Sequence, residues 1–253
     1  MVRTDSSVPG GTVRDALVLA AGNGDRFNIG TRRSKLLQPI LGQPLILRTL
    51  ATAHEAGIAS FEFVVGYEAD AVRSAIESAV PAGISVSFTV NPEWHLENGV
   101  SALAARERFG DRRFALLMGD HLFEAQVLAR LLHTAAAPGE SLLAIDTRQA
   151  PPEVAAEATK VRLQGSRIVA IGKDLDEYDA LDTGLFVCAP ALFPALDEAR
   201  RAGDTTLSGG IRQLAALGLM RGVSIGDAAW YDIDTPADLR TAESLLASQP
   251  EHA

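Results

Sequence analysis

Two glycines and two cations follow an apolar run near the start of the chain. Gly22 and Gly24 lie in LAAGNGDRF, with Arg26 in the same stretch and Lys35 just beyond it. Glycines let backbone N–H groups turn toward phosphate oxygens, and an arginine with a lysine supplies the positive charge that a triphosphate requires. The dinucleotide fingerprint is excluded because Phe27 occupies its third glycine position, and no Walker A Gly-Lys-Ser/Thr follows. By itself, the pattern also fits an ordinary loop with surface cations.

Three aspartates are candidates for binding a cation. Asp120 follows the apolar run FALLMG, and Asp232 with Asp234 lies in WYDIDTP, much later in the chain. Each could instead cap a helix, since aspartate is a favoured cap. Combined with a phosphate-binding loop, the carboxylates predict a Mg2+ site, because Mg2+ binds one or two carboxylates together with phosphate oxygens and water.

These residue types suit attack by a substrate phosphate on the α-phosphorus of a triphosphate, with release of pyrophosphate. The nucleophile is already an anion, so no general base is required, and the protein must align two repelling anions. The five histidines lack metal-ligand spacing. We interpret His121, beside Asp120, as a packed histidine at a strand end, with substrate contact as the alternative.

Alternating apolar strands and helices must position these groups. Continuous apolar strands separated by helices predict an α/β fold, a doubly wound, mostly parallel sheet covered on both faces. After residue 146, the strands VRL and RIVAI around Gln164–Ser166 predict a small β-hairpin sub-lobe. We expect a flexible N-terminal arm (1–14), a single domain (15–247) and a flexible tail (248–253). Within the domain, a nucleotide-binding half spans about 15–146 and an acceptor-binding half about 147–247.

The composition of the chain limits the classes of partner that we expect. The chain has 253 residues and a net charge of -9, which argues against a nucleic-acid partner. It has one cysteine, no apolar run long enough to cross a bilayer and no signal-peptide core, so we expect a cytoplasmic protein without membrane insertion.

The loop and the segment SKLLQPILGQPLI together resemble the sugar nucleotidyltransferase superfamily, which implies a Rossmann-like nucleotidyltransferase fold. The resemblance implies catalytic roles for Arg26 and Lys35 at the α-phosphate. It also implies metal-binding roles for Asp120 and Asp232, with Asp234 as second choice. Ser34 departs from the proline usual before the lysine of this family. The resemblance further implies nucleotide binding by the loop residues Leu19, Ala20, Ala21, Gly22, Asn23 and Gly24.

The segment ENGVS is a candidate for reading the base. An amide at Asn98, the open backbone at Gly99 and the hydroxyl of Ser101 can bond the edge of a pyrimidine, although asparagine also caps helices. The pattern resembles cytidylyltransferases, which implies CTP. Hydrogen-bond chemistry alone leaves CTP and UTP undistinguished.

The second half resembles the CTP:inositol-1-phosphate cytidylyltransferases through MGDHLFE, ATKV and IGKDLDEYDALDTG. This resemblance implies transfer of CMP from CTP to inositol 1-phosphate, a small phosphorylated polyol, giving CDP-inositol. Lysines bind phosphate as point charges, and polar side chains bond polyol hydroxyls. The predicted acceptor-binding residues are Lys160, Lys173, Asp182, Thr183 and Gly184. The two lysines could instead be solvated residues of the hairpin.

Several alternatives remain open. They are a cytidylyltransferase for phosphocholine or a phosphonate, another sugar-1-phosphate nucleotidyltransferase, and a nucleotide-sensing domain without turnover. Choline is disfavoured because the second half has few aromatic residues for cation–π contact. A homodimer through the second half is common in similar proteins and remains open here.

Overall fold

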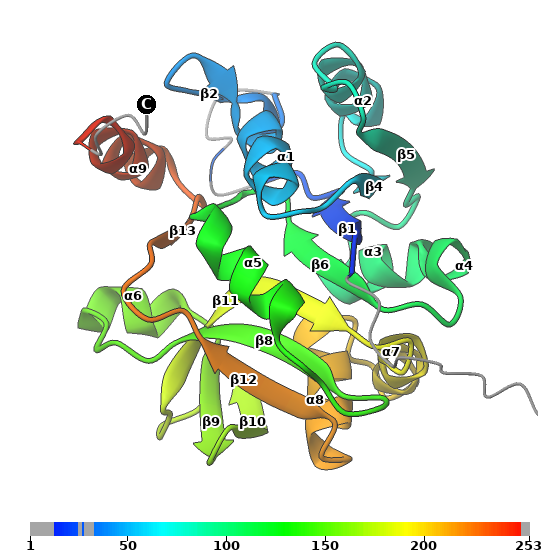
Figure 1. The fold of residues 1–253 in the computed structure, drawn as a ribbon, viewed down its shortest axis with the longest axis vertical. Helices are drawn as coiled ribbons and strands as arrows, with labels where there is room; N and C mark the ends of the chain where they lie inside the picture. The colour runs from blue at the N-terminus through cyan, green and yellow to red at the C-terminus, as the bar shows by residue number, and fades with distance from the viewer. Residues whose placement is uncertain (1–12, 25–26, 28–32, 249–253) are drawn as a thin grey trace, which may run out of the picture.

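The computed structural model describes residues 13–24, 27 and 33–248. Most of the predicted arm and tail therefore lies outside the described residues. The strands of the main sheet are β1 (Asp15–Ala20), β4 (Ser60–Val65), β5 (Ser85–Val90), β6 (Phe114–Met118), β8 (Ser141–Asp146), β9 (Lys160–Gln164), β10 (Arg167–Gly172), β11 (Ala180–Cys188) and β12 (Met220–Ser224). They form a nine-stranded sheet in the order β5-β4-β1-β6-β11-β8-β12-β10-β9 (Figure 1).

Short strands and helices complete the architecture. The short strands are β2 (Pro39–Ile40), β3 (Gln43–Pro44), β7 (His121–Phe123) and β13 (Trp230–Asp232). The helices are α1 (Leu45–Glu55), α2 (Ala69–Glu77), α3 (Asn98–Ala104), α4 (Arg106–Phe109), α5 (Ala125–His133), α6 (Pro152–Glu157), α7 (Leu192–Arg201), α8 (Leu207–Ala216) and α9 (Pro236–Ser248), with a 3-10 turn, η1 (Lys35–Leu37). β2 pairs with β3, and β13 pairs with β7.

Helices cover both faces of the sheet. This arrangement explains why the sequence of β1 is apolar on both sides of the strand. Ala16 and Val18 pack into a core that includes residues of α1, α2 and α5. Leu17 and Leu19 point the other way, into a core with residues of α3, α7 and α8. Because successive strand residues face opposite sides and both sides are buried, β1 has no polar alternation. The predicted doubly wound α/β fold is confirmed.

The sheet is parallel in its first part and mixed in its second. β5, β4, β1 and β6 are mutually parallel neighbours, as predicted. In contrast, β11 runs antiparallel to both β6 and β8. It follows β10 after a short connection (173–179) without a helix, and a parallel return would need a longer crossover.

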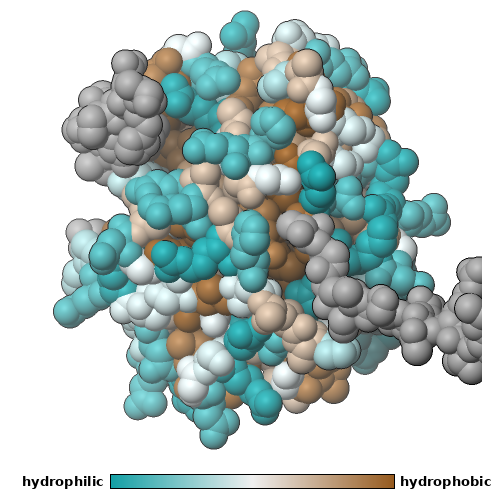
Figure 2. Space-filling model, viewed as in Figure 1, coloured by the Kyte–Doolittle hydropathy of each residue, from teal (hydrophilic) through white to brown (hydrophobic). Residues whose placement is uncertain are grey.

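The predicted hairpin is formed by β9 and β10, with Gly165 at φ +64° in its turn. β9 also pairs with β11, so the hairpin closes this end of the sheet onto β11. Strands from both predicted halves thus share one sheet, and the boundary between the halves near residue 146 stays a prediction. Hydrophilic and hydrophobic residues intermix over the face in Figure 2, as is usual for protein surfaces. Within the described residues, no helix combines the length and apolarity that a bilayer span requires.

Candidate active site

Lys35 lies at the centre of the candidate site. It begins η1, after Ser34, whose hydroxyl accepts from the backbone N–H of Leu36. Its Nζ lies 2.7 Å from Oδ2 of Asp120 and 2.9 Å from Oδ1 of Asp234, and its side chain is 9% exposed. Burial would lower the pKa of Lys35, but the two carboxylates outweigh burial and hold that pKa above its ordinary value. The site therefore contains an ammonium whose charge two carboxylates stabilise.

Asp120 reaches this position through a turn. The apolar run FALLMG contains β6, which ends at Met118, and β7 begins at His121 after the turn at Gly119 and Asp120. The N–H of Gly119 donates to the carbonyl of Leu19 at 2.9 Å, and a Cβ at Gly119 would lie 2.9 Å from that oxygen. The missing side chain thus lets the turn pass beside the end of β1. Asp120 is consequently close to the predicted phosphate loop.

The other two aspartates arrive by strand pairing. β13 runs antiparallel to β7 and places Asp232 opposite His121. The next residue, Ile233, donates its N–H to the carbonyl of Asp120 at 3.2 Å, and Asp234 then meets Lys35. The pairing therefore brings the second-choice aspartate, rather than the first, onto Lys35.

His121 links the carboxylates to β11. Its Nε2 lies 3.4 Å from Oδ1 of Asp232 and 3.8 Å from Oδ1 of Asp120, and its Nδ1 lies 2.8 Å from the carbonyl of Thr183. Burial lowers the pKa of His121, but Asp232 and the other partners outweigh burial and raise that pKa to about 10. The ring is buried, as predicted for a packed histidine, but it also belongs to the cluster of charges. In the sequence, the position of His121 directly after Asp120 was the one feature that could have indicated this role.

The carboxylate cluster fits a divalent cation. Ligand atoms of Asp120, His121 and Asp232 all lie within 4.8 Å of one another. Asp232 is 43% exposed and Asp120 is 25% exposed, so an ion could approach from solvent. With Asp234, three carboxylates face one lysine and one histidine, and Mg2+ prefers carboxylate oxygens. Asp120 and Asp232 are the residues that could hold it.

The described part of the glycine loop touches Lys35. Gly24 has φ +64°, and a Cβ there would lie 3.0 Å from Cγ of Lys35. Nearer β1, the carbonyl of Ala21 accepts from the N–H of Tyr67 at 2.9 Å. The structure thus brings the loop and Lys35 together, as the sequence predicts. Arg26 lies outside the described residues, so its catalytic role stays a prediction.

The side chains of the ENGVS segment form hydrogen bonds within the protein. Oδ1 of Asn98 accepts from the N–H of Leu207 at 2.8 Å, and Oγ of Ser101 bonds Nδ2 of Asn91 at 3.0 Å. A Cβ at Gly99 would lie 2.6 Å from a backbone oxygen in the segment before α8. These residues hold α3 close to the start of α8. Their predicted contact with the base is untested by this geometry and stays a prediction.

The predicted acceptor residues fall into two groups. Asp182, Thr183 and Gly184 lie within β11, and the buried hydroxyl of Thr183 donates to a β8 carbonyl at 2.8 Å. Burial raises the pKa of Asp182 to about 6. In contrast, Nζ of Lys160 donates to the carbonyl of Lys173 at 3.0 Å, on the hairpin. The structure therefore brings the β11 residues to His121, while Lys160 is bonded within the hairpin.

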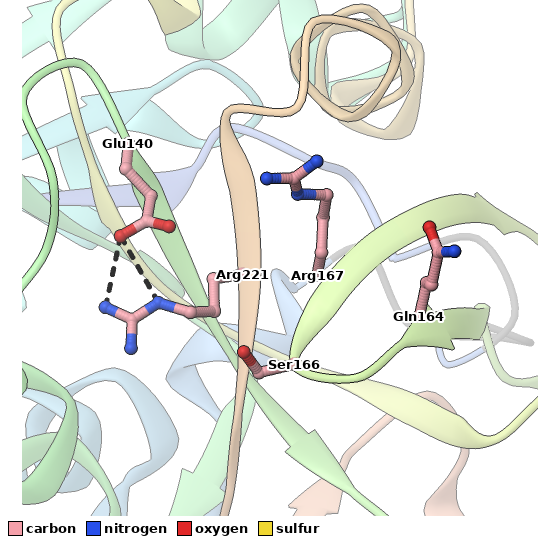
Figure 3. Close-up of a pocket in the computed structure, with 5 residues that line it drawn as sticks. All are labelled: Glu140, Gln164, Ser166, Arg167 and Arg221. Carbon is pink, nitrogen blue, oxygen red and sulfur yellow. Dashed lines mark hydrogen bonds and ion pairs between the residues drawn. The ribbon is translucent and has the colours of Figure 1, made fainter.

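A pocket of about 380 Å³ lies elsewhere (Figure 3). Its lining residues are Glu140, Gln164, Ser166, Arg167 and Arg221. Arg221 pairs with Leu142 near the start of β8, whereas Asp182 pairs with Ile145 near its end. The Arg221 guanidinium turns to Glu140, with nitrogen–oxygen distances of 3.2 and 3.1 Å. This pocket is therefore at the opposite end of β8 from the carboxylate cluster.

Comparisons with known proteins identify similar chains. The chain is 36% identical over 236 residues to the bifunctional IPC transferase and DIPP synthase of Rubrobacter xylanophilus, covering 91% of this chain and 51% of that protein. It is 34% identical over 249 residues to the CMP-5'-(3-aminopropyl)phosphonate synthase of Streptomyces rubellomurinus, covering 90% and 38% respectively. The chain thus spans about half, or less, of the length of these relatives.

One solved structure and a family model extend the comparison. The inositol-1-phosphate CTP transferase from T. maritima superimposes with a TM-score of 0.83 at 25% identity, covering 96% of this chain and 99% of that one. Residues 16–216 match the model of the MobA-like NTP transferase domain, and this range includes the glycine loop, Lys35 and Asp120. The chain therefore belongs to the MobA-like NTP transferase domain family.

Proposed function

We propose that this chain catalyses the Mg2+-dependent transfer of CMP from CTP to inositol 1-phosphate, giving CDP-inositol and pyrophosphate. An oxygen of the acceptor phosphate forms a bond to the α-phosphorus of CTP. The bond from that phosphorus to the bridging oxygen breaks, and pyrophosphate leaves with the electron pair. The cytoplasm stays the expected compartment, and a homodimer stays a prediction.

The position of Lys35 carries the proposal for the reaction class. Its buried ammonium lies beside the glycine loop and bonds Asp120 and Asp234, so it can offer positive charge to a phosphoryl group without moving far. Arg26 is proposed as a second cation at the α-phosphate. When bound at Asp120 and Asp232, Mg2+ would neutralise phosphate charge that develops in the transition state.

His121 and β11 complete the proposed site. Contacts to Asp232 and to the Thr183 carbonyl fix the imidazole, so it can orient the Asp232 carboxylate. Asp182 follows the Leu181 position that pairs with Asp146 at the end of β8. We assign Asp182 to the hydroxyls of the acceptor, with Lys160 and Lys173 as further contacts from the hairpin.

The choice of inositol 1-phosphate is supported by the T. maritima structure at 25% identity and by the IPC transferase relative at 36%. A second acceptor class has its own support. The phosphonate synthase relative is 34% identical over 90% of this chain, so a phosphonate is the competing acceptor. Both acceptors would present an anionic oxygen to the same α-phosphorus.

A matrix of substrates tests the proposal. Pyrophosphate release is measured with CTP, UTP, ATP and GTP against inositol 1-phosphate, 3-aminopropylphosphonate, phosphocholine and glucose 1-phosphate, with and without Mg2+. The expected result is turnover with CTP and inositol 1-phosphate only when Mg2+ is present. Turnover with the phosphonate and none with inositol 1-phosphate would replace the acceptor. Nucleotide binding without pyrophosphate release from any pair would support the nucleotide-sensing alternative.

A further inference from the structure

Among the described residues, two that are not glycine have a left-handed backbone, Leu41 at φ 46° and Glu68 at φ 49°. An L-residue with a side chain is strained in this region, and such strain persists where the surroundings hold it. Leu41 lies in the exposed turn between β2 and β3. Glu68 lies directly before α2, at the end of the sheet where the candidate site forms.

The side chain of Glu68 reaches back to the turn that carries Lys35. Its Oε2 accepts a hydrogen bond from the backbone N–H of Ser34. Ser34 is fully buried, and its own hydroxyl caps η1. Because Lys35 is the next residue, the carboxylate of Glu68 holds the backbone from which the Lys35 side chain projects.

The residues beside Glu68 hold the glycine loop from the same segment. The N–H of Tyr67 donates to the carbonyl of Ala21 at 2.9 Å. A Cβ at Gly66 would lie 2.9 Å from the same oxygen and 2.3 Å from Cβ of Trp94, so the backbone is held close on both sides. Residues 66–68 therefore contact both the start of the glycine loop and the turn at Ser34.

We propose that Glu68 is a positioning residue, which fixes η1 so that the Lys35 ammonium stays beside Asp120 and Asp234 during phosphoryl transfer. The left-handed backbone is retained because it turns the chain from β4 into α2 while the side chain still faces Ser34. The expected effect of Glu68 on turnover rests on the proposed function, whereas its effect on the backbone at Ser34 does not depend on that function.

Two substitutions separate positioning from general stability. Glu68→Gly relieves the backbone strain and removes the carboxylate, and glycine remains acceptable at a helix N-cap. We expect stability to urea close to that of the parent, because relief of the backbone strain offsets the loss of the hydrogen bond to Ser34. We also expect a fall in kcat of at least tenfold with a smaller change in KM for CTP, and at least tenfold faster exchange of the Ser34 amide hydrogen. Glu68→Gln keeps an oxygen acceptor, so its kcat and exchange rate should stay within threefold of the parent.

Leu41→Gly is the matched control, because it relieves the same backbone strain at an exposed turn. It should leave kcat and Ser34 exchange unchanged. Parental turnover in Glu68→Gly, or slow Ser34 exchange in that variant, would overturn the proposal, as would a Glu68→Gln variant as impaired as Glu68→Gly. If the parent chain turns over no substrate pair, the proposed function fails, whereas the exchange measurement still decides whether Glu68 holds η1.

Discussion

The imidazole of His121 lies directly against the α-carbon of Gly184. A Cβ at Gly184 would lie 2.4 Å from both Cε1 and Nδ1 of the ring. Gly184 also has φ +74°, within the irregular part of β11 between Asp182 and Phe186. Glycine is therefore required at this position for two reasons, the backbone conformation and the space that the ring occupies.

Gly184→Ala should displace His121 and, through it, Asp232. We expect turnover to fall about 100-fold, since small misplacements in a reacting site cost that much. Overpacking should also reduce the free energy of unfolding by about 1–3 kcal/mol. Gly165→Ala is the control, because Gly165 has φ +64° with nothing within 4 Å of its added Cβ. If kinetics and urea unfolding show equal effects for both variants, the contact with His121 is irrelevant to turnover.

Lys35→Met should separate phosphoryl chemistry from cation binding. Loss of the ammonium removes charge from the reacting phosphate, so kcat should fall about 100- to 1000-fold. It also leaves Asp120 and Asp234 without their shared partner, so Mg2+ should bind more tightly. Steady-state kinetics and calorimetric Mg2+ titration measure the two effects. Lys35→Arg retains the charge with a different shape and should keep the parental Mg2+ affinity; weaker Mg2+ binding by Lys35→Met would contradict this account.

Asp232 and Asp234 should have different roles despite their proximity. Asp232 belongs to the cluster with Asp120 and His121, whereas Asp234 bonds Lys35. Asp232→Asn should therefore raise the Mg2+ concentration for half-maximal activity at least tenfold. Asp234→Asn should lower kcat and leave that concentration near its parental value. Activity measured across a Mg2+ series distinguishes them, and the reverse pattern would assign the metal to Asp234.

Local patterns predict the first part of the site well. The apolar strand before Gly22, the position of Lys35 and the strand end at Asp120 follow from neighbouring residues, and the structure brings them together. The position of Asp234 does not follow in this way. It depends on the three-residue pairing of β13 with β7, which is too short to show an alternating pattern. The family resemblance therefore ranked Asp232 first without indicating that Asp234 would meet Lys35.

Long-range packing explains the other differences. The antiparallel path of β11 depends on strands that come together only in the folded sheet, so the apolar pattern alone predicted a mostly parallel sheet. His121 contacts the distant residues Thr183 and Asp232, and Glu68 contacts the distant residue Ser34. None of these contacts follows a period of 2 or 3.6 residues, so hydrophobic patterning could not reveal them.

The raised pKa of Asp182 predicts a stability that depends on pH. Burial raises this pKa from 3.8 to about 6 in the folded chain, so the folded state binds the proton more tightly than the unfolded state. The contribution of Asp182 to the free energy of unfolding should therefore fall as pH rises from about 4 to about 6. Asp182→Asn removes this penalty, and its stability advantage should grow by about 1–2 kcal/mol between pH 5 and pH 7.5. Urea unfolding at the two pH values measures the difference. Asp179→Asn is the control, because Asp179 is an exposed carboxylate in the connection between β10 and β11. An advantage independent of pH would mean that the carboxyl is already ionised at pH 5, and the folded chain would then not raise the pKa of Asp182.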